Sequence, residues 1–116
     1  MPVDVATFSQ RWVDAWNAHD VEAVLDHFAD EVVFTSPIAA QVVPASSGRI
    51  EGKAALRDYW TRALSRRPDL HFTVEAVYEG IDVVVINYRN QRGHLVNEVL
   101  CFADGLVIEG HGTYLT

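Results

Sequence analysis

Four runs rich in Val, Ile, Phe and Tyr fill the C-terminal part of the chain, and they constrain the fold more than any other feature. They are separated by Glu79-Gly80, by residues 91–93 and by Asp104-Gly105, which are typical of tight turns between antiparallel strands. The predicted strands are residues 71–78, 81–90, 94–103 and 106–115. Three successive hairpins predict an antiparallel meander, and such a sheet needs helices over one face to bury its apolar side.

The N-terminal half of the chain supplies those helices. Apolar residues recur at helical spacing over residues 5–16 and 21–28, with Asp4 and Asp20 placed to cap the two helices. A third helix is predicted over residues 53–66, and a short strand over residues 32–36 ends at a proline. The pattern therefore predicts a single α+β domain covering residues 1–116.

The segment 37–51 shows no periodicity and contains two prolines and a Ser-Ser-Gly run. A structureless connection of this length in a compact domain is typically a lid or a binding loop. We expect this segment to form one wall of a site.

Two glycines near the C-terminus indicate an open space inside the fold. Gly110 and Gly112 share one face of the last predicted strand. Two missing side chains in a packed interior leave a costly void unless something else fills it, and a ligand is one such occupant. The alternatives are a strongly bent strand, or the close approach of a helix or a second subunit.

Charge and composition exclude several classes of function. Nine Lys and Arg against sixteen Asp and Glu give a net charge of -7, so we expect no binding to nucleic acid or to an anionic membrane. No apolar run approaches the roughly 18 to 20 residues that span a bilayer, and the N-terminus lacks the pattern of a secretion signal. Cys101 is the single cysteine, and the histidines lack metal-ligand spacing. We therefore expect a soluble, cytoplasmic protein without a metal or bound cofactor.

Four segments together carry a resemblance to a known family. They are residues 12–20 (WVDAWNAHD), 24–37 (VLDHFADEVVFTSP), 48–60 (GRIEGKAALRDYW) and 98–108 (EVLCFADGLVI). In this order they resemble the SnoaL-like and ketosteroid-isomerase-like branch of the nuclear transport factor 2-like superfamily. The resemblance implies a cone-shaped, curved antiparallel sheet wrapped around helices, a fold also described as cystatin-like. It also implies a cavity between the long helix and the concave face of the sheet.

The resemblance places three catalytic positions of the steroid isomerases in this sequence. The tyrosine that donates to the oxyanion matches Trp12, the aspartate base matches Ser36, and the protonated aspartate in the sheet matches Glu98. Only one of the three groups is retained, which argues against ketosteroid isomerisation by that mechanism. Serine does not abstract a carbon-bound proton without a base beside it.

Glu98 is the strongest candidate for a catalytic residue. Even positions of its strand are predicted to face inward, and His94 and Val96 share that face. Burial in an apolar cavity raises the pKa of a carboxyl, so that it can act as an acid or a base near neutrality. A small polar substrate group could bridge Glu98 and His94. Alternatively, Glu98 pairs with Asn87 or Arg89 across the hairpin, or a bulge turns it outward.

The family arrangement implies a pocket of aromatic, small and polar residues. Its expected lining is Trp16, Phe34, Ser36, Ile38, Trp60, Val96, Gly110, Gly112 and Tyr114, with Trp12 as an orienting group. Such a lining suits a flat hydrophobic ligand with one or two oxygens. Alternatively, the aromatic rings fill the core themselves.

Two functions remain open at this point. One is a cofactor-independent isomerase, cyclase, dehydratase or hydrolase that acts on a small apolar substrate, with Glu98 as acid or base. The other is a non-catalytic ligand-binding or homodimerisation module, favoured by Ser36 at the position of the base. Glu109 and His111 alternate with the glycines and are predicted to face a partner, and the resemblance implies a homodimer through the outer sheet face.

Overall fold

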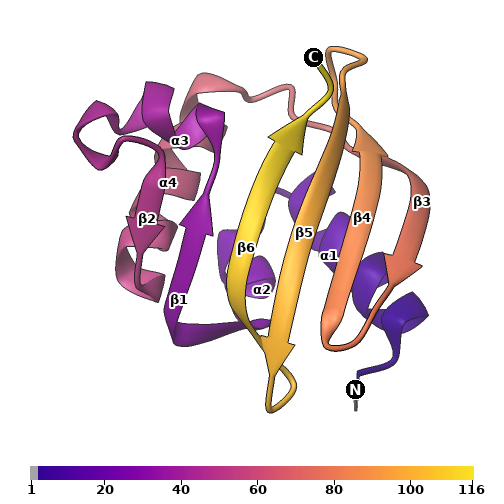
Figure 1. Cartoon of the computed structure of the whole chain (residues 1–116). Helices are drawn as coiled ribbons and strands as arrows, with labels where there is room; N and C mark the ends of the chain where they lie inside the picture. Colours follow the sequence, from indigo (N-terminus) through magenta and orange to yellow (C-terminus); the bar gives the residue numbers. More distant parts are fainter. Residues whose placement is uncertain (1–2) are drawn as a thin grey trace.

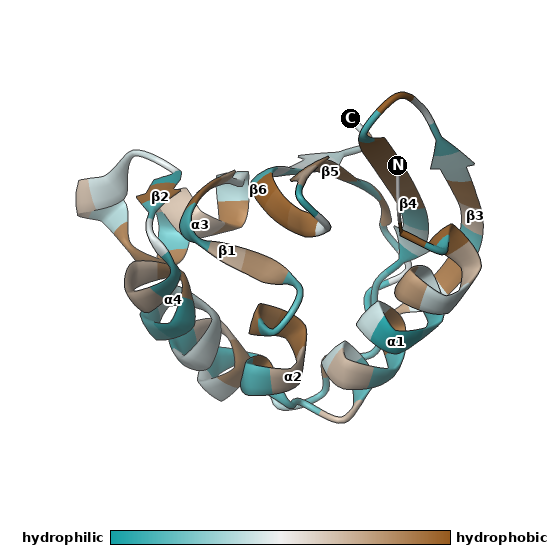
Figure 2. Ribbon diagram, turned by 90° about the horizontal axis from the view of Figure 1, so that it is seen from below, coloured by the Kyte–Doolittle hydropathy of each residue, from teal (hydrophilic) through white to brown (hydrophobic). Residues whose placement is uncertain are grey.

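The computed structural model describes residues 3–116 as a six-stranded sheet with helices packed behind it (Figure 1). The helices are α1 (Val5–Asn17), α2 (Val21–Leu25), α3 (Pro37–Val42) and α4 (Lys53–Arg66), with the short 3-10 helix η1 (Pro44–Ser46). The strands are β1 (Phe28–Thr35), β2 (Arg49–Glu51), β3 (Thr73–Glu79), β4 (Val83–Arg89), β5 (Leu95–Ala103) and β6 (Leu106–Tyr114). Figure 2 shows the sheet arching over α1, α2 and α4. The predicted α+β fold with a curved sheet is therefore confirmed.

The strand order is β2-β1-β6-β5-β4-β3. The four C-terminal strands pair antiparallel in sequence, as the hairpin signals predict. One pairing outside the meander differs from the antiparallel pattern, because β1 pairs parallel with β6. β1 is separated from β6 by α4 and the other three strands of the meander, so no hairpin fixes their relative direction.

The start of the chain confirms both predicted helix caps. The Asp4 side chain accepts a hydrogen bond from Thr7 N at 3.0 Å, and Asp20 accepts one from Ala23 N at 3.0 Å. The helix expected over residues 21–28 is shorter than predicted, since α2 ends at Leu25 and Phe28 begins β1. Phe28 is buried, and it could be buried either at the end of a helix or at the start of a strand. The spacing of apolar residues therefore could not distinguish a helix from a strand at this position.

The prediction of a structureless segment over residues 37–51 is wrong. This segment holds α3, η1 and β2, and β2 pairs antiparallel with β1. Ser36 caps α3 by accepting a hydrogen bond from Ile38 N at 3.1 Å, and Pro37 occupies the first helical position. A capping serine followed by proline is a helix-start signal, but the helix is too short to show apolar periodicity.

Two features decide which residues of β5 and β6 point inward: side chains alternate between the two faces of each strand, and β6 contains one bulge. In β5 the even positions from Val96 to Phe102 are buried, as predicted. The register between β5 and β6 shifts between Cys101 and Phe102. Beyond the shift, Gly110 and Gly112 are buried on the inner side. The bulge therefore aligns both glycines with the face that covers the helices.

Candidate functional site

A cavity of about 380 Å³ lies between α3, α4, the end of α1 and the inner face of the sheet. Nine of the residues predicted for the site line it: Trp16, Phe34, Ser36, Ile38, Trp60, His94, Glu98, Gly112 and Tyr114. The volume falls within the range of small-molecule pockets, and most of the lining side chains are aromatic or aliphatic. The rings of Trp16 and Trp60 therefore form walls of the cavity without filling it.

Three predicted site residues lie outside the cavity lining. Trp12 is fully buried, and its ring centroid lies 5.8 Å from that of Phe72 and 5.4 Å from that of Tyr88. Trp12 therefore packs behind two residues that line the cavity. Val96 is a core residue of β5 with 1% of its surface exposed. A Cβ atom at Gly110 would lie 2.9 Å from a ring carbon of Phe34, so this glycine makes room for the Phe34 ring and not for a ligand.

Glu98 projects into the cavity from the middle of β5. It is 5% exposed, and its Oε1 atom accepts a long hydrogen bond of 3.4 Å from the Tyr88 hydroxyl. Burial raises the pKa of the Glu98 carboxyl to about 7, and the bond from Tyr88 offsets part of this effect. At neutral pH the carboxyl is therefore present in both its acidic and its basic form.

The alternative partners considered for Glu98 are wrong. Asn87 donates to the Asn97 side chain at 2.8 Å, and Arg89 forms an ion pair with Glu75 at 3.2 Å. Both are odd-numbered residues of β4 and face the outer side of the sheet, because side chains alternate along a strand. The inward neighbour Tyr88 is the side chain that reaches Glu98.

Three tyrosine hydroxyls and one serine surround the carboxyl. Burial raises the pKa values of Tyr59, Tyr88 and Tyr114, with that of Tyr114 reaching about 12. Hydrogen bonds with Ser36 lower the pKa of Tyr59 and Tyr114 to a smaller extent. All three phenols are therefore neutral at physiological pH and available as hydrogen-bond donors.

Sequence reasoning missed two of these tyrosines. Tyr88 follows Val84 and Ile86 on the buried face of β4, so the period-two pattern carried a signal for its inward orientation. Tyr59 precedes Trp60 on α4, and both are buried against the cavity. Nothing in the helical spacing distinguishes a core tyrosine from one that lines a cavity.

A pair of reciprocal hydrogen bonds fixes one wall of the cavity. The Asn17 side chain donates to Phe72 O at 3.0 Å and accepts from Phe72 N at 2.8 Å. His19 Nε2 lies 2.9 Å from Leu70 O. Phe72 and Leu70 line the cavity, so these contacts anchor their backbone to the end of α1.

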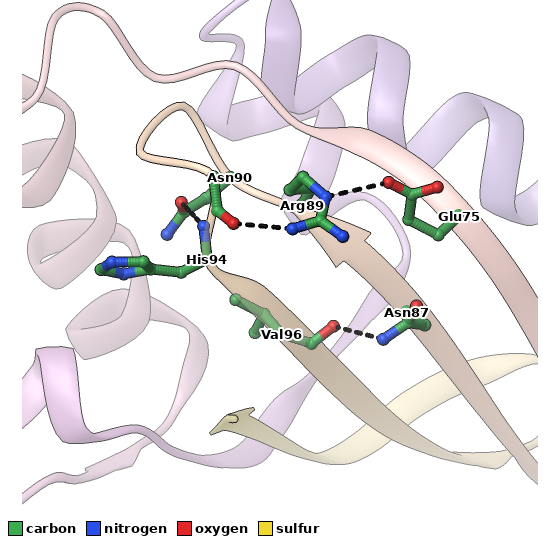
Figure 3. A network of polar contacts seen from close by, with 7 residues as sticks. Glu75, Asn87, Arg89, Asn90, His94 and Val96 are labelled. Carbon is green, nitrogen blue, oxygen red and sulfur yellow. Dashed lines mark hydrogen bonds and ion pairs between the residues drawn. The ribbon is translucent and has the colours of Figure 1, made fainter. Parts of the chain in front are cut away.

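The turn between β4 and β5 forms part of the cavity rim. The Asn90 side chain accepts a hydrogen bond from the backbone N atom of His94 at 3.0 Å (Figure 3). It also accepts one from Arg92 N at 3.0 Å. Arg89 bonds Gly93 O at 2.9 Å and pairs with Glu75. The exposed His94 ring extends away from that ion pair, and Asn90, Arg92 and His94 line the mouth of the cavity.

Glu109 and His111 lie on the outer face of β6. His111 Nε2 is 2.9 Å from Glu109 Oε2, and its Nδ1 atom hydrogen-bonds with the Thr35 hydroxyl. Within residues 3–116, no group of three His, Cys, Asp or Glu side chains is arranged to hold a metal ion. No helix in this described part of the chain is long and apolar enough to cross a membrane.

The chain is similar to known proteins over most of its length. The family model of the SnoaL-like domain matches residues 9–111. A crystal structure of a SnoaL-like protein of unknown function from Burkholderia thailandensis is 42% identical to the chain, with a TM-score of 0.90. The similarity covers 97% of this chain and 94% of that one. No curated protein matches the sequence.

More distant structures share the fold. An NTF2-like protein from Cytophaga hutchinsonii has a TM-score of 0.72 at 13% identity, and the match covers 99% of this chain and 93% of the other. TerC, co-crystallised with polyporic acid, has a TM-score of 0.78 at 13% identity over 95% of this chain and 90% of its own. Together with a neighbour described as having a cystatin-like fold, these structures confirm the predicted fold class.

Proposed function

The chain belongs to the SnoaL-like domain family, and from this membership and the cavity we propose that it transforms a small apolar, oxygen-bearing molecule by acid–base chemistry at Glu98. One observation carries the proposal. A carboxyl with a pKa of about 7 lies buried in a cavity among neutral phenol groups. A base whose pKa is close to the working pH transfers protons most efficiently.

The proposed chemical step is a proton transfer from carbon. The Glu98 carboxylate removes a proton from a carbon next to a substrate carbonyl, and the C–H electron pair forms an enolate. The enolate oxygen accepts a hydrogen bond from Tyr59 or Tyr114, whose hydroxyls stay protonated at neutral pH. Glu98 then returns the proton to another atom of the substrate. The net reaction is an isomerisation without oxidation or reduction.

The same pair of groups also serves related reactions. Elimination of water, ring closure through the enolate, or activation of a water molecule by Glu98 would make the chain a dehydratase, a cyclase or a hydrolase. All of these reactions proceed without a cofactor. Ser36, which matches the base of the steroid isomerases, caps α3 and contacts the tyrosines, so the proposal assigns the base to β5.

A general proton-transfer probe tests this proposal before the substrate is known. In 5-nitrobenzisoxazole, removal of the ring C–H proton breaks the N–O bond and releases a coloured phenolate. We expect the protein to accelerate this elimination with a pH midpoint near 7, and Glu98→Gln to lose about 100-fold or more of the rate. Glu109→Gln removes a carboxylate from the outer face and serves as the control. A Glu98→Gln variant as fast as the wild type would contradict the proposal.

A second candidate function is ligand binding without turnover. The observation that favours it is Ser36 at the position of the steroid-isomerase base. TerC was co-crystallised with polyporic acid, which supports binding of small molecules by this fold, although at 13% identity that likeness extends to the fold alone. Quenching of Trp16 and Trp60 fluorescence by an apolar carbonyl compound, without any elimination activity, would favour binding alone.

We also propose that two copies of the chain associate through the outer sheet face. Val85, Val99 and Cys101 are half-buried there, and Ile108 is 39% exposed. Val85 and Val99 lie opposite each other on β4 and β5. On β6 the residues opposite Val99 and Cys101 are His111 and Glu109, so a second sheet would cover both apolar and polar side chains.

Light scattering tests this association. We expect a mass close to twice the 13.0 kDa of the chain, reduced to one copy by Val99→Lys. The control is Ile81→Lys, which adds the same charge at a turn position that is 94% exposed. A wild-type protein that stays monomeric at high concentration would contradict the dimer.

A further inference from the structure

The charged groups at the cavity have a sign opposite to that of the whole chain. The chain carries a net charge of -7, yet the cavity lining contains two guanidinium groups, Arg67 and Arg92, and one carboxyl, Glu98. Within residues 3–116, neither arginine forms an ion pair with a carboxylate. The mouth of the cavity is therefore a positively charged place on an acidic protein.

The two arginines reach the cavity from different elements. Arg67 is the C-terminal cap of α4, and its guanidinium donates a long hydrogen bond of 3.4 Å to Arg66 O. Arg92 lies in the turn that Asn90 holds by its side chain. Both side chains are exposed. Guanidinium groups are always charged and bind carboxylate and phosphate oxygens in pairs, so this arrangement fits an anion at the mouth.

One side-chain donor beside the cavity lacks a hydrogen-bond partner. Trp16 lines the cavity and is 6% exposed, and its buried indole N–H has no hydrogen-bond partner among residues 3–116. The indole nitrogen has almost no exposed surface, so an acceptor oxygen on a bound molecule could satisfy it only after the ring shifts. The Trp16 ring also contacts Trp60 edge-to-face at 4.9 Å, so this donor lies in an aromatic environment.

We infer that the ligand of this cavity is a small amphipathic anion, with its apolar, oxygen-bearing part among the aromatic side chains and its anionic group at the mouth between Arg67 and Arg92. The inference rests on the proposed function, since it names the substrate class of the same site. Carboxylates and phosphates share this recognition chemistry.

Electrostatics also fix the orientation of such a ligand. An anionic group placed beside Glu98 would face a second negative charge in a poorly solvated interior, where like charges repel strongly. The same group at the mouth remains partly hydrated beside two cations. The neutral end of the molecule, which would react, is therefore directed toward Glu98.

Calorimetric titration with three matched probes tests the inference. They are 2-naphthoate, its neutral amide 2-naphthamide, and 2-naphthyl phosphate. We expect the wild type to bind naphthoate about tenfold more tightly than naphthamide at low salt, with the preference reduced by added salt. The affinities of 2-naphthyl phosphate and 2-naphthoate, compared with each other, show which of the two anionic groups binds more tightly at the mouth of the cavity.

Two double variants separate the arginines at the mouth from general charge. Arg67→Gln/Arg92→Gln is expected to abolish the preference for naphthoate and to leave naphthamide binding unchanged. The control Arg49→Gln/Arg66→Gln removes the same charge from residues outside the cavity lining and should retain the preference.

The outcomes distinguish this inference from the proposed function. The inference is wrong if the wild type binds naphthoate and naphthamide equally, or if Arg67→Gln/Arg92→Gln still prefers naphthoate. Neither result contradicts the cavity or the proposed chemistry at Glu98. If none of the probes binds, both the inference and the proposed function are contradicted.

Discussion

Glu98 and Gly112 lie directly opposite each other on β5 and β6, and the missing side chain of Gly112 leaves the space beside the carboxyl open. A Cβ atom at position 112 would lie 3.6 Å from Glu98 Oε1 and 3.4 Å from Ser36 Oγ. These are ordinary contact distances, so the glycine is not required by a clash. It leaves the carboxyl accessible from the cavity.

Gly112→Ala is therefore expected to fold normally. Alanine makes contacts without strain, and replacing glycine in a strand lowers the entropy of the unfolded chain, so the free energy of unfolding should change by no more than about 1 kcal/mol. The added methyl group excludes water from Glu98 and should raise its pKa above about 7. Urea unfolding and the pH dependence of the elimination reaction measure the two effects. A lowered pKa would contradict the assigned geometry.

Gly110→Ala should behave differently, although it is the same change two residues earlier. The new Cβ atom would lie 2.9 Å from a ring carbon of Phe34 and 3.3 Å from a Leu100 methyl group. The Phe34 ring must shift, and we expect a loss of about 1 to 3 kcal/mol in the free energy of unfolding. Urea unfolding in parallel with Gly112→Ala checks this. Equal stability of the two variants would show that Phe34 does not need the space.

The raised pKa of Glu98 predicts a specific dependence of stability on pH. The folded carboxyl holds its proton up to about pH 7, whereas the unfolded carboxyl releases it near 4.5. The contribution of Glu98 to the free energy of unfolding therefore falls as the pH rises from about 4.5 to about 7, by about 3 kcal/mol in total. Glu98→Gln should not lose this stability, because glutamine has no ionisable group.

The difference in unfolding free energy between Glu98→Gln and the wild type should thus increase from pH 4.5 to pH 8. Urea titrations across this range measure it, with Glu109→Gln as the outer-face control. Parallel curves for Glu98→Gln and the wild type would mean that Glu98 titrates normally in the folded protein.

Tyr88→Phe tests the hydrogen bond to the carboxyl. The Tyr88 hydroxyl stabilises the ionised form of Glu98, so its removal should raise the pKa of Glu98 further. We expect the pH midpoint of the elimination reaction to move upward. Tyr78→Phe, at a position that is 61% exposed, should leave it in place. A downward shift in Tyr88→Phe would contradict the assigned bond.

The sequence predicted the parts of the fold that are governed by local pattern. Side chains alternate between the two faces of a strand, so counting from Leu100 and Phe102 predicted that Glu98 points inward, and the three turn signals predicted the meander. The helix over residues 53–66 was predicted at its observed bounds, because its apolar stripe is long and ends before a proline. These features depend on residues close together in the chain.

Features that depend on distant contacts were not predictable in the same way. The parallel pairing of β1 with β6 brings Phe34 beside Gly110 across most of the chain, and no local signal encodes it. The same applies to the cavity lining. Trp12 and Trp16 lie one helical turn apart, yet only Trp16 lines the cavity, because Phe72 and Tyr88 cover Trp12.

The titration of the Glu98 carboxyl by carbon-13 NMR, with and without 2-naphthamide, tests the central claim most directly. An open cavity with a buried carboxyl predicts a midpoint near pH 7, a signal that moves when naphthamide is added, and its absence from Glu98→Gln. A midpoint near the ordinary value of 4.5, or a signal unmoved at high naphthamide concentration, would contradict it.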